Sequence, residues 1–242
     1  MKRTAIVLLL IAAVASLLAA QARGPIVDKI LFNARSQIDV GLKDVAEGRS
    51  DLWRYSTDGA AWKALPPDVV SRLDPYSTAG AFYISLYLNP IPNAAPYSFT
   101  ATDGKTYFNP FAIREVRYAL NFLINRKQII DEIMLGAGVP MYTPVIQGQP
   151  NASRYDLIAS KFGFTATGNE KKAISDITAA MTAAAALPEN KGKLARNGQW
   201  WTYNGEPVTV NFVIRVDDPT LRLPEGRYVA DQIEKAGIKV NR

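Results

Sequence analysis

The side chains of this chain that could do chemistry are carboxylates, hydroxyls, lysine amines and aromatic rings, because the 242 residues include no cysteine and no histidine. This composition excludes disulfides, zinc sites of the Cys/His kind, thiol nucleophiles and acid–base catalysis through imidazole. Serine has no histidine partner, and no G-x-S-x-G or S-x-x-K sequence supports another kind of serine nucleophile. The residues therefore favour a binding or scaffold protein over an enzyme.

Asp217 and Asp218 form a tight carboxylate pair in a predicted loop after a strand. Such a pair suits a hard cation or an acid–base couple. No further carboxylate stands at the spacing of a metal-binding loop, however, and Asp-Asp-Pro is common in turns. We therefore favour a turn, and expect neither a metal nor a cofactor.

Two other local patterns are candidates for a functional role. Trp200 and Trp201 are adjacent and could line a site, although paired tryptophans in a strand are typically half in the core and half at the surface. Asn151-Ala152-Ser153 satisfies the sequon for glycosylation, which makes Asn151 a candidate acceptor.

The net charge of +6 is modest, and no block of five or six like charges occurs. The sequence therefore indicates no nucleic-acid partner. With 48% apolar residues, the chain has enough hydrophobic side chains to form a core.

The first 22 residues resemble a signal peptide. Lys2 and Arg3 precede an apolar run that ends in Ala20-Gln21-Ala22. A basic head, an apolar middle and an A-x-A end are what a signal peptidase recognises. We expect cleavage after Ala22 and a secreted or cell-surface protein; an uncleaved signal anchor is the alternative.

The next segment is predicted to be a strand, a helix and a strand. Residues 26–33 alternate apolar and polar side chains, residues 40–47 have helical spacing and end at Gly48, and residues 50–56 are short and aromatic. Such a βαβ-like unit would place Trp53 and Tyr55 at a strand end that borders a crevice. Residues 81–88 are rich in β-formers and predict a further strand, which Asn89-Pro90 stops.

A turn-rich linker over residues 89–109 leads to helices. Asn109 is a suitable N-cap and Pro110 a suitable first helical residue. The apolar stripe that follows predicts one long helix, or two abutting helices that bend near Asn125, up to a breaker at residues 136–140. Residues 169–187 predict another amphipathic helix.

The last part of the chain predicts a hairpin, a helix and a strand. Residues 200–203 and 208–214 alternate around Asn204-Gly205. A helix over residues 227–236 should end at Gly237, and residues 238–240 should begin a strand.

One region resembles a known family. The string NPFAIREVRYALNFLINRKQIIDEIMLGAG, which begins at Asn109, is similar to a region of the extracellular solute-binding proteins of family 5, which serve oligopeptide, dipeptide and nickel ABC importers. The sequence departs from the family at Asn125, where Asp is usual. The matching residues are Phe111, Val116, Arg117, Ala119, Leu120, Ile124, Arg126, Ile129, Ile130, Gly136, Gly138 and Pro140.

The resemblance implies an α/β fold of the periplasmic-binding-protein type (type II) in incomplete form. Residues 23–87 would be part of a first lobe and residues 88–242 the first half of a second lobe, with Leu86, Leu88 and Asn89 at the hinge. Family members have two lobes that close on a ligand. We therefore expect a separately encoded second chain, a dimer of this chain or a truncated gene product.

The function that the resemblance implies is ligand capture for a peptide-type ABC importer, with a peptide or another small solute and an ABC permease as partners and with no catalysis. Trp53, Tyr55, Tyr83 and Tyr87 are the candidate crevice residues, and core packing is the competing interpretation of each. The alternative function is an exported structural or assembly protein that keeps the fold without a working pocket.

Overall fold

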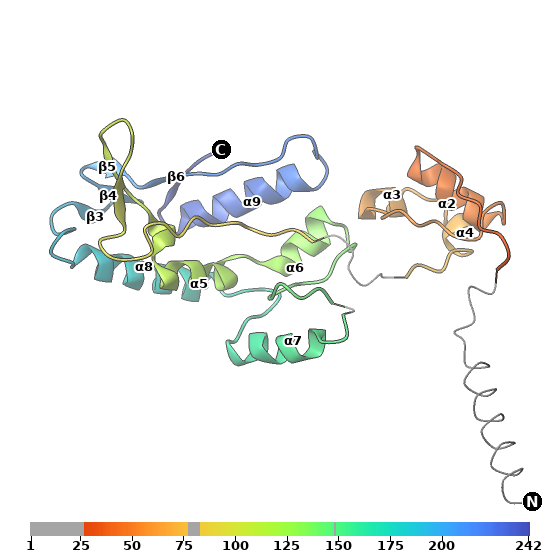
Figure 1. The fold of residues 1–242 in the computed structure, drawn as a ribbon, viewed down its shortest axis with the longest axis horizontal. Helices are drawn as coiled ribbons and strands as arrows, with labels where there is room; N and C mark the ends of the chain where they lie inside the picture. The colour runs from red at the N-terminus through yellow and green to blue at the C-terminus, as the bar shows by residue number, and fades with distance from the viewer. Residues whose placement is uncertain (1–26, 77–82, 148) are drawn as a thin grey trace, which may run out of the picture. The chain divides into compact units, whose positions relative to one another are not determined.

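The computed structural model describes residues 27–76, 83–147 and 149–242 (Figure 1). The predicted signal peptide and its cleavage site after Ala22 lie outside these residues. The chain divides into two units, Met1–Gln37 and Ile38–Arg242, and each is described by itself.

Residues 27–37 contain no strand, so the strand predicted over residues 26–33 is wrong over its described part, residues 27–33. Val27, Ile30, Leu31 and Phe32 are all exposed, and Phe32 is 86% exposed. The alternation of apolar and polar side chains is typical of a strand, but a strand also needs a neighbouring strand to share its backbone hydrogen bonds. None of the described residues supplies one to this segment.

Helix α2 (Ile38–Ala46) confirms the helix predicted over residues 40–47. It ends as expected at Gly48, which has a φ of 73°. The Gly48 N–H donates to the Val45 carbonyl over 3.0 Å and the Arg49 N–H to the Asp44 carbonyl over 2.8 Å. These two bonds form a Schellman motif, which satisfies carbonyls that the end of a helix leaves without partners.

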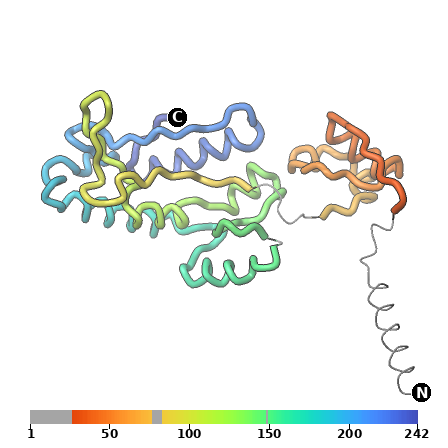
Figure 2. The backbone as a smooth tube through the Cα atoms, in the orientation of Figure 1, coloured from red at the N-terminus to blue at the C-terminus, as the bar shows by residue number. Residues whose placement is uncertain are grey.

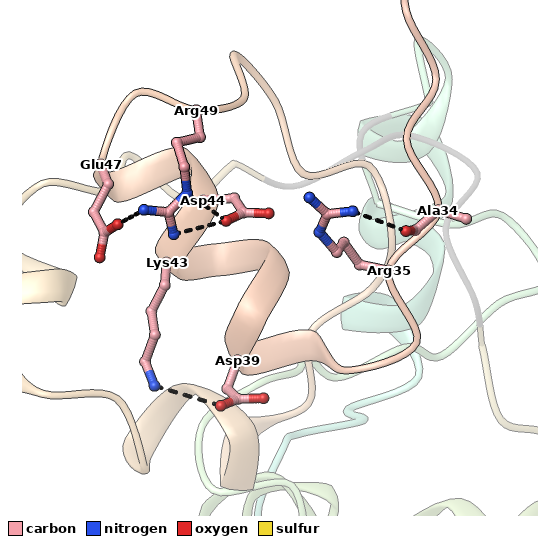
Figure 3. Close-up of polar contacts among 7 residues, drawn as sticks. All are labelled: Ala34, Arg35, Asp39, Lys43, Asp44, Glu47 and Arg49. Atoms are coloured by element: carbon pink, nitrogen blue, oxygen red, sulfur yellow. Dashed lines mark hydrogen bonds and ion pairs between the residues drawn. The ribbon is translucent and has the colours of Figure 1, made fainter.

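Polar contacts hold the two ends of α2 (Figure 3). The Arg49 guanidinium donates to the buried Asp44 carboxylate, with Nη2 at 2.7 Å and Nε at 2.8 Å from Oδ1. Lys43 pairs with Asp39 at 3.5 Å across one helical turn. Because the Asp44–Arg49 pair bridges the Schellman turn, it fixes the direction in which the chain leaves the helix.

The strand predicted over residues 50–56 is wrong, and so is the βαβ-like unit. Two short helices follow α2 instead, α3 (Gly59–Lys63) and α4 (Pro67–Val70). The Asp58 side chain caps α3 by accepting from the Ala61 N–H over 2.7 Å. Residues 50–56 themselves form neither a helix nor a strand, and no strand among the described residues pairs with them. The small core of this region consists of Leu42, Leu65 and Val69.

Residues 83–88 are extended but form no strand, so the strand predicted over residues 81–88 is wrong over its described part. Residues 81 and 82 lie outside the described residues. The linker predicted after them contains a hairpin, β1 (Ser98–Thr100) and β2 (Thr106–Phe108), with Phe99 opposite Tyr107. The sequence prediction missed this hairpin because its strands are only three residues long.

The helical region after Asn109 is two abutting helices. A 3-10 turn, η1 (Pro110–Ala112), leads into α5 (Arg114–Leu123), and α6 (Arg126–Gln128) continues into a π-helical turn, η2 (Ile129–Ile133). The break lies at Asn125, whose side chain accepts from the Gln128 N–H over 3.0 Å. This confirms the bent alternative, since Asn125 caps a new helix there.

Helices α5 and α8 (Glu170–Ala185) pack against each other and form the centre of the larger core. Val116 and Ala119 on α5 and Ile177 and Met181 on α8 are completely buried. The structure confirms α8, with the Asn169 side chain as its cap. Helix α7 (Ala152–Lys161) was not predicted; only Ala159 in it is buried, so it has no apolar stripe facing a core.

The predicted hairpin is confirmed at its turn. Asn204 and Gly205 have φ values of 54° and 86°, as a type I′ turn requires, and they join β4 (Trp200–Tyr203) to β5 (Glu206–Pro207). A strand that was not predicted, β3 (Leu194–Asn197), lies on the other side of β4.

The chain then leaves this sheet for another. Residues 208–214 were expected to pair with β4, but β6 (Thr209–Asn211) pairs in parallel with β7 (Lys239–Asn241), which confirms the predicted terminal strand. Helix α9 (Arg222–Lys235) connects them and begins five residues earlier than predicted. It ends before Gly237, as expected, which has a φ of 84°.

Candidate functional site

The region with the clearest features of a site is residues 83–91, which are yellow in Figure 2. They contain the predicted hinge residues Leu86, Leu88 and Asn89, and we call them the hinge segment. Burial along residues 83–88 alternates strictly. Leu86 and Leu88 pack against the main core, whereas Tyr83 is 47% exposed and Tyr87 84% exposed. The segment therefore presents two tyrosines on its outward side, while its predicted hinge leucines anchor it.

Asn109 fixes the end of the hinge segment. Its side-chain amide donates to the Asn89 carbonyl and to the Ile91 carbonyl, both over 2.8 Å. Its side-chain oxygen accepts from the Phe111 N–H over 3.0 Å, which is the capping bond expected from the sequence. Asn89 adds a bond from the Ile91 N–H to its own side-chain oxygen over 3.0 Å. Asn109 thus joins the hinge segment to the start of η1 and α5.

A second asparagine that the sequence prediction missed holds the following loop. Asn190 is completely buried, and its amide donates to the Pro96 carbonyl over 2.9 Å and to the Ala184 carbonyl over 3.0 Å. The loop after the hinge segment is thereby tied to the end of α8. No pattern in the sequence marks this residue, because its two partners are backbone atoms that only the fold brings near it.

Two arginines of the family-like region, Arg117 and Arg126, donate hydrogen bonds to backbone carbonyls. Arg117 Nη1 donates to the Phe111 carbonyl over 2.5 Å and to the Ala112 carbonyl over 3.1 Å. These bonds fix η1 against the first turn of α5. The spacing of Phe111 and Arg117 therefore allows the arginine to attach the turn to the helix.

Arg126 has the same kind of role at the next break. Its Nε donates to the Met141 carbonyl over 2.9 Å, and its Nη2 donates to the Asn121 side-chain oxygen over 2.9 Å. The guanidinium also lies over the ring of Tyr142, 4.9 Å from its centroid. Burial lowers the pKa of Arg126, and the nearby Tyr142 opposes this shift. Arg126 thus joins the end of α5 to the chain that follows the breaker.

The structure separates the four aromatic residues predicted to line a crevice into two kinds. Trp53 is half-buried against the small core of Leu42, Leu65 and Val69, and its ring lies so close to Gly41 that a side chain there would collide with it. Tyr55 is 73% exposed. Core packing therefore accounts for Trp53, whereas Tyr55, Tyr83 and Tyr87 have exposed rings that a ligand could contact.

The remaining candidates have local structural roles. Asp217 pairs with Arg215, with distances of 3.0 and 2.6 Å from its two oxygens, and this contact lowers the pKa of Asp217. Asp218 accepts from the Leu221 N–H over 3.1 Å ahead of α9. Among the described residues, no group of three or more acidic side chains could hold a metal ion. The two carboxylates therefore belong to a turn.

The remaining predicted positions are the paired tryptophans and the glycosylation candidate. Trp201 is buried and Trp200 half-buried, which is the ordinary arrangement for paired tryptophans. Asn151, the glycosylation candidate, is exposed just ahead of α7. No helix within the described ranges is both long and apolar enough to cross a membrane.

Comparison with known proteins identifies the class as a solute-binding protein. Residues 22–242 match the family described as bacterial extracellular solute-binding proteins, family 5 Middle, and the chain belongs to this family. This confirms the expected periplasmic-binding-protein-like fold class. The residues that carried the resemblance, from Phe111 to Pro140, lie within the match.

The chain is also similar to a solved structure, the oligopeptide-binding protein AppA from Bacillus subtilis in complex with a nonapeptide. The identity is 18% and the TM-score 0.36, over 52% of this chain and 22% of that one. The match thus spans less than a quarter of the length of AppA. No curated protein matches this chain.

Proposed function

We propose that this chain is an exported substrate-binding component, or half of one, of a peptide-type ABC importer. The observation that carries the proposal is the family match over residues 22–242. In this proposal the chain captures a peptide or another small solute without covalent chemistry, in a cleft between two lobes, and delivers it to an ABC permease. Export through residues 1–22 and cleavage after Ala22 place the protein outside the cytoplasm.

The hinge segment supports a role in ligand contact. Tyr83 and Tyr87 lie on its exposed side, and exposed aromatic rings on an anchored backbone suit a ligand that has both apolar and polar groups. Leu86, Leu88 and Asn89 form the hinge in this proposal, and the Asn109 clamp holds its end. Tyr55 is a further contact residue. Because Trp53 packs against the small core, only the part of its ring that faces solvent is available to a ligand.

Thermal unfolding with mixed di- to pentapeptides tests this function. A ligand that binds the folded state at 100 times its Kd stabilises it by about 2.7 kcal/mol. For a chain of this size that corresponds to a rise in Tm of about 5–10 °C. Tyr87→Ala should reduce the rise, whereas Tyr155→Ala, which removes a tyrosine that is 39% exposed on α7, should leave it unchanged. A Tm that does not move at millimolar peptide would refute the importer role.

The alternative, an exported assembly protein without a working pocket, gives the opposite pair of results. Its Tm would not respond to peptides, and its apparent mass would be a multiple of the chain mass. The observation that keeps this alternative open is that the backbone of residues 83–88 bonds to no backbone group of another described residue. Peptide-dependent stabilisation together with loss of the effect in Tyr87→Ala would exclude it.

A further inference from the structure

Asn151 occupies an exposed turn directly ahead of α7. The Ala152 N–H donates to the Gln149 carbonyl over 3.0 Å, which closes a turn with Pro150 in its second position. Asn151 has a φ of −98° and a ψ of 0°, the values of the third residue in a type I turn. Both Asn151 and Ser153 are exposed. The local backbone therefore fixes Asn151 in a turn and leaves it at the surface.

The side-chain amide of Asn151 has no structural task. An asparagine ahead of a helix usually accepts a bond from the first turn, and Asn109, Asn125 and Asn169 all do so. Asn151 makes no capping bond, and its side chain has no hydrogen-bond partner among the described residues. Of the asparagines in residues 1–240, no other has a serine or threonine two positions on. Its sequon therefore combines a free amide with an exposed hydroxyl at Ser153.

An apolar stripe begins one turn after Asn151 on the same face of α7. Tyr155, Ile158 and Phe162 follow Asn151 at intervals of four, three and four residues, which is the spacing of one helix face. These three side chains are 39%, 47% and 50% exposed, and we call them the α7 stripe. Exposed apolar surface of this kind attracts other molecules unless something covers it. The sequon stands at the head of the stripe.

We propose that Asn151 carries an N-linked glycan whose first sugars lie over the α7 stripe. A glycan is bulky and hydrophilic, and it is attached at the protein surface. The C–H faces of its first sugar rings can pack on Tyr155 and Ile158, while their hydroxyls remain in water. The glycan would thus hide the apolar side chains that α7 leaves exposed. This inference rests on the export that is part of the proposed function.

The attachment needs an oligosaccharyltransferase and one donor, an oligosaccharide bound to a polyprenyl diphosphate. The Asn151 amide nitrogen forms a bond to the anomeric carbon of the first sugar, and the bond from that carbon to the phosphate oxygen breaks. Polyprenyl diphosphate leaves, and the amide nitrogen loses one proton to the solvent. The Ser153 hydroxyl is the part of the sequon that makes Asn151 an acceptor.

Mass spectrometry of the protein isolated from the cells that naturally produce it tests the modification. Trypsin cleaves after Lys127 and Arg154, so the peptide of residues 128–154 contains Asn151. We expect this peptide to be heavier than its sequence by a whole number of sugar residues, with the added mass on Asn151. In the same cells, the Ser153→Ala protein should lack the added mass. The Ser153→Thr protein should keep it, because threonine also supplies a hydroxyl.

The reactivity of Tyr155 tests whether the glycan covers the α7 stripe. Tetranitromethane nitrates accessible tyrosine rings, so Tyr155 should react about threefold more slowly in Ser153→Thr than in Ser153→Ala. Tyr87 is the control, because it is 84% exposed and lies on the hinge segment. Its nitration rate should be the same in both proteins.

Two results would overturn the proposal: an unmodified peptide of residues 128–154 in the natural protein, or equal nitration rates of Tyr155 in the two variants. The N-terminus separates this failure from a failure of processing. An unmodified chain that begins at Arg23 would overturn the glycan alone, whereas an unmodified chain that begins at Met1 would also overturn the expected cleavage. A glycosylated chain whose Tm does not respond to peptides would refute the importer role and leave the glycan in place.

Discussion

The ionisation of Glu225 should make the stability of this protein fall as the pH rises. Glu225 is half-buried in the first turn of α9, and its carboxylate makes no hydrogen bond to another described residue. Burial raises its pKa from 4.5 to about 7; nearby Arg222 opposes the shift and Asp218 adds to it. In the unfolded chain the carboxyl regains its ordinary pKa, so the two states release this proton at different pH.

The sign follows from proton linkage. Between pH 4.5 and pH 7 the folded protein holds a proton on Glu225 that the unfolded chain has released, so the free energy of unfolding decreases with rising pH. Above pH 7 both states are ionised and the effect is constant. The difference in pKa corresponds to about 3 kcal/mol at 1.36 kcal/mol per unit. Because the side chain is only half-buried, solvent screening reduces this to about 1–2 kcal/mol.

The Glu225→Gln variant isolates this contribution. Glutamine has nearly the same shape and does not ionise, so the variant should gain about 1–2 kcal/mol over the wild type between pH 4.5 and pH 8. Urea unfolding followed by tryptophan fluorescence measures the difference, with Trp53→Phe and Trp62→Phe in both proteins so that only Trp200 and Trp201 report.

Glu206→Gln serves as the control, because Glu206 is exposed in the hairpin. Its difference from the wild type should stay within about 0.5 kcal/mol at every pH. The reasoning fails if Glu225→Gln has a constant offset from pH 4.5 to pH 8, or if it loses stability relative to the wild type as the pH rises.

Two other substitutions test the clamp and the end of α9, both by the free energy of unfolding in urea. Asn109→Ala removes two donated hydrogen bonds and a helix cap and should cost about 2 kcal/mol. Asn109→Asp keeps the capping oxygen and should cost less; equal losses would show that the donated bonds contribute nothing. Gly237→Ala places a side chain at a φ of +84° against the Arg196 guanidinium and should cost about 2 kcal/mol or more. Gly192→Ala has a similar φ but open space around it and should cost about 1 kcal/mol; a larger loss there would contradict the role given to the collision.

The elements that could be predicted from the sequence are those stabilised by neighbouring residues. Helix α2 ends in a Schellman motif at Gly48, and Asn125 caps the helix that follows α5. The turn at Asn204 and Gly205 joins its two strands through local backbone conformation. In each case the partner atoms lie within about five residues, so residue type and spacing were sufficient.

The wrong predictions all concern strands. Residues 26–33 and 50–56 have the composition of strands, but the described residues pair with neither. Residues 209–211 have a strand pattern too, but they pair with residues 239–241, about thirty positions away, instead of with the neighbouring β4. A strand is completed by a partner that its own sequence does not name, so alternation alone cannot decide whether or where it pairs.

The candidate site shows the same division between local contacts and contacts between distant segments. The sequence by itself determined the family, through residues such as Arg117 and Arg126, and the cap at Asn109. Only the tertiary structure revealed that these arginines hold backbone carbonyls, that Asn109 also clamps the hinge segment, and that Trp53 packs in a core while Tyr87 is exposed. The physical reason is that capping depends on atoms close in the chain, whereas burial and long-range hydrogen bonds depend on which distant segments the fold brings together.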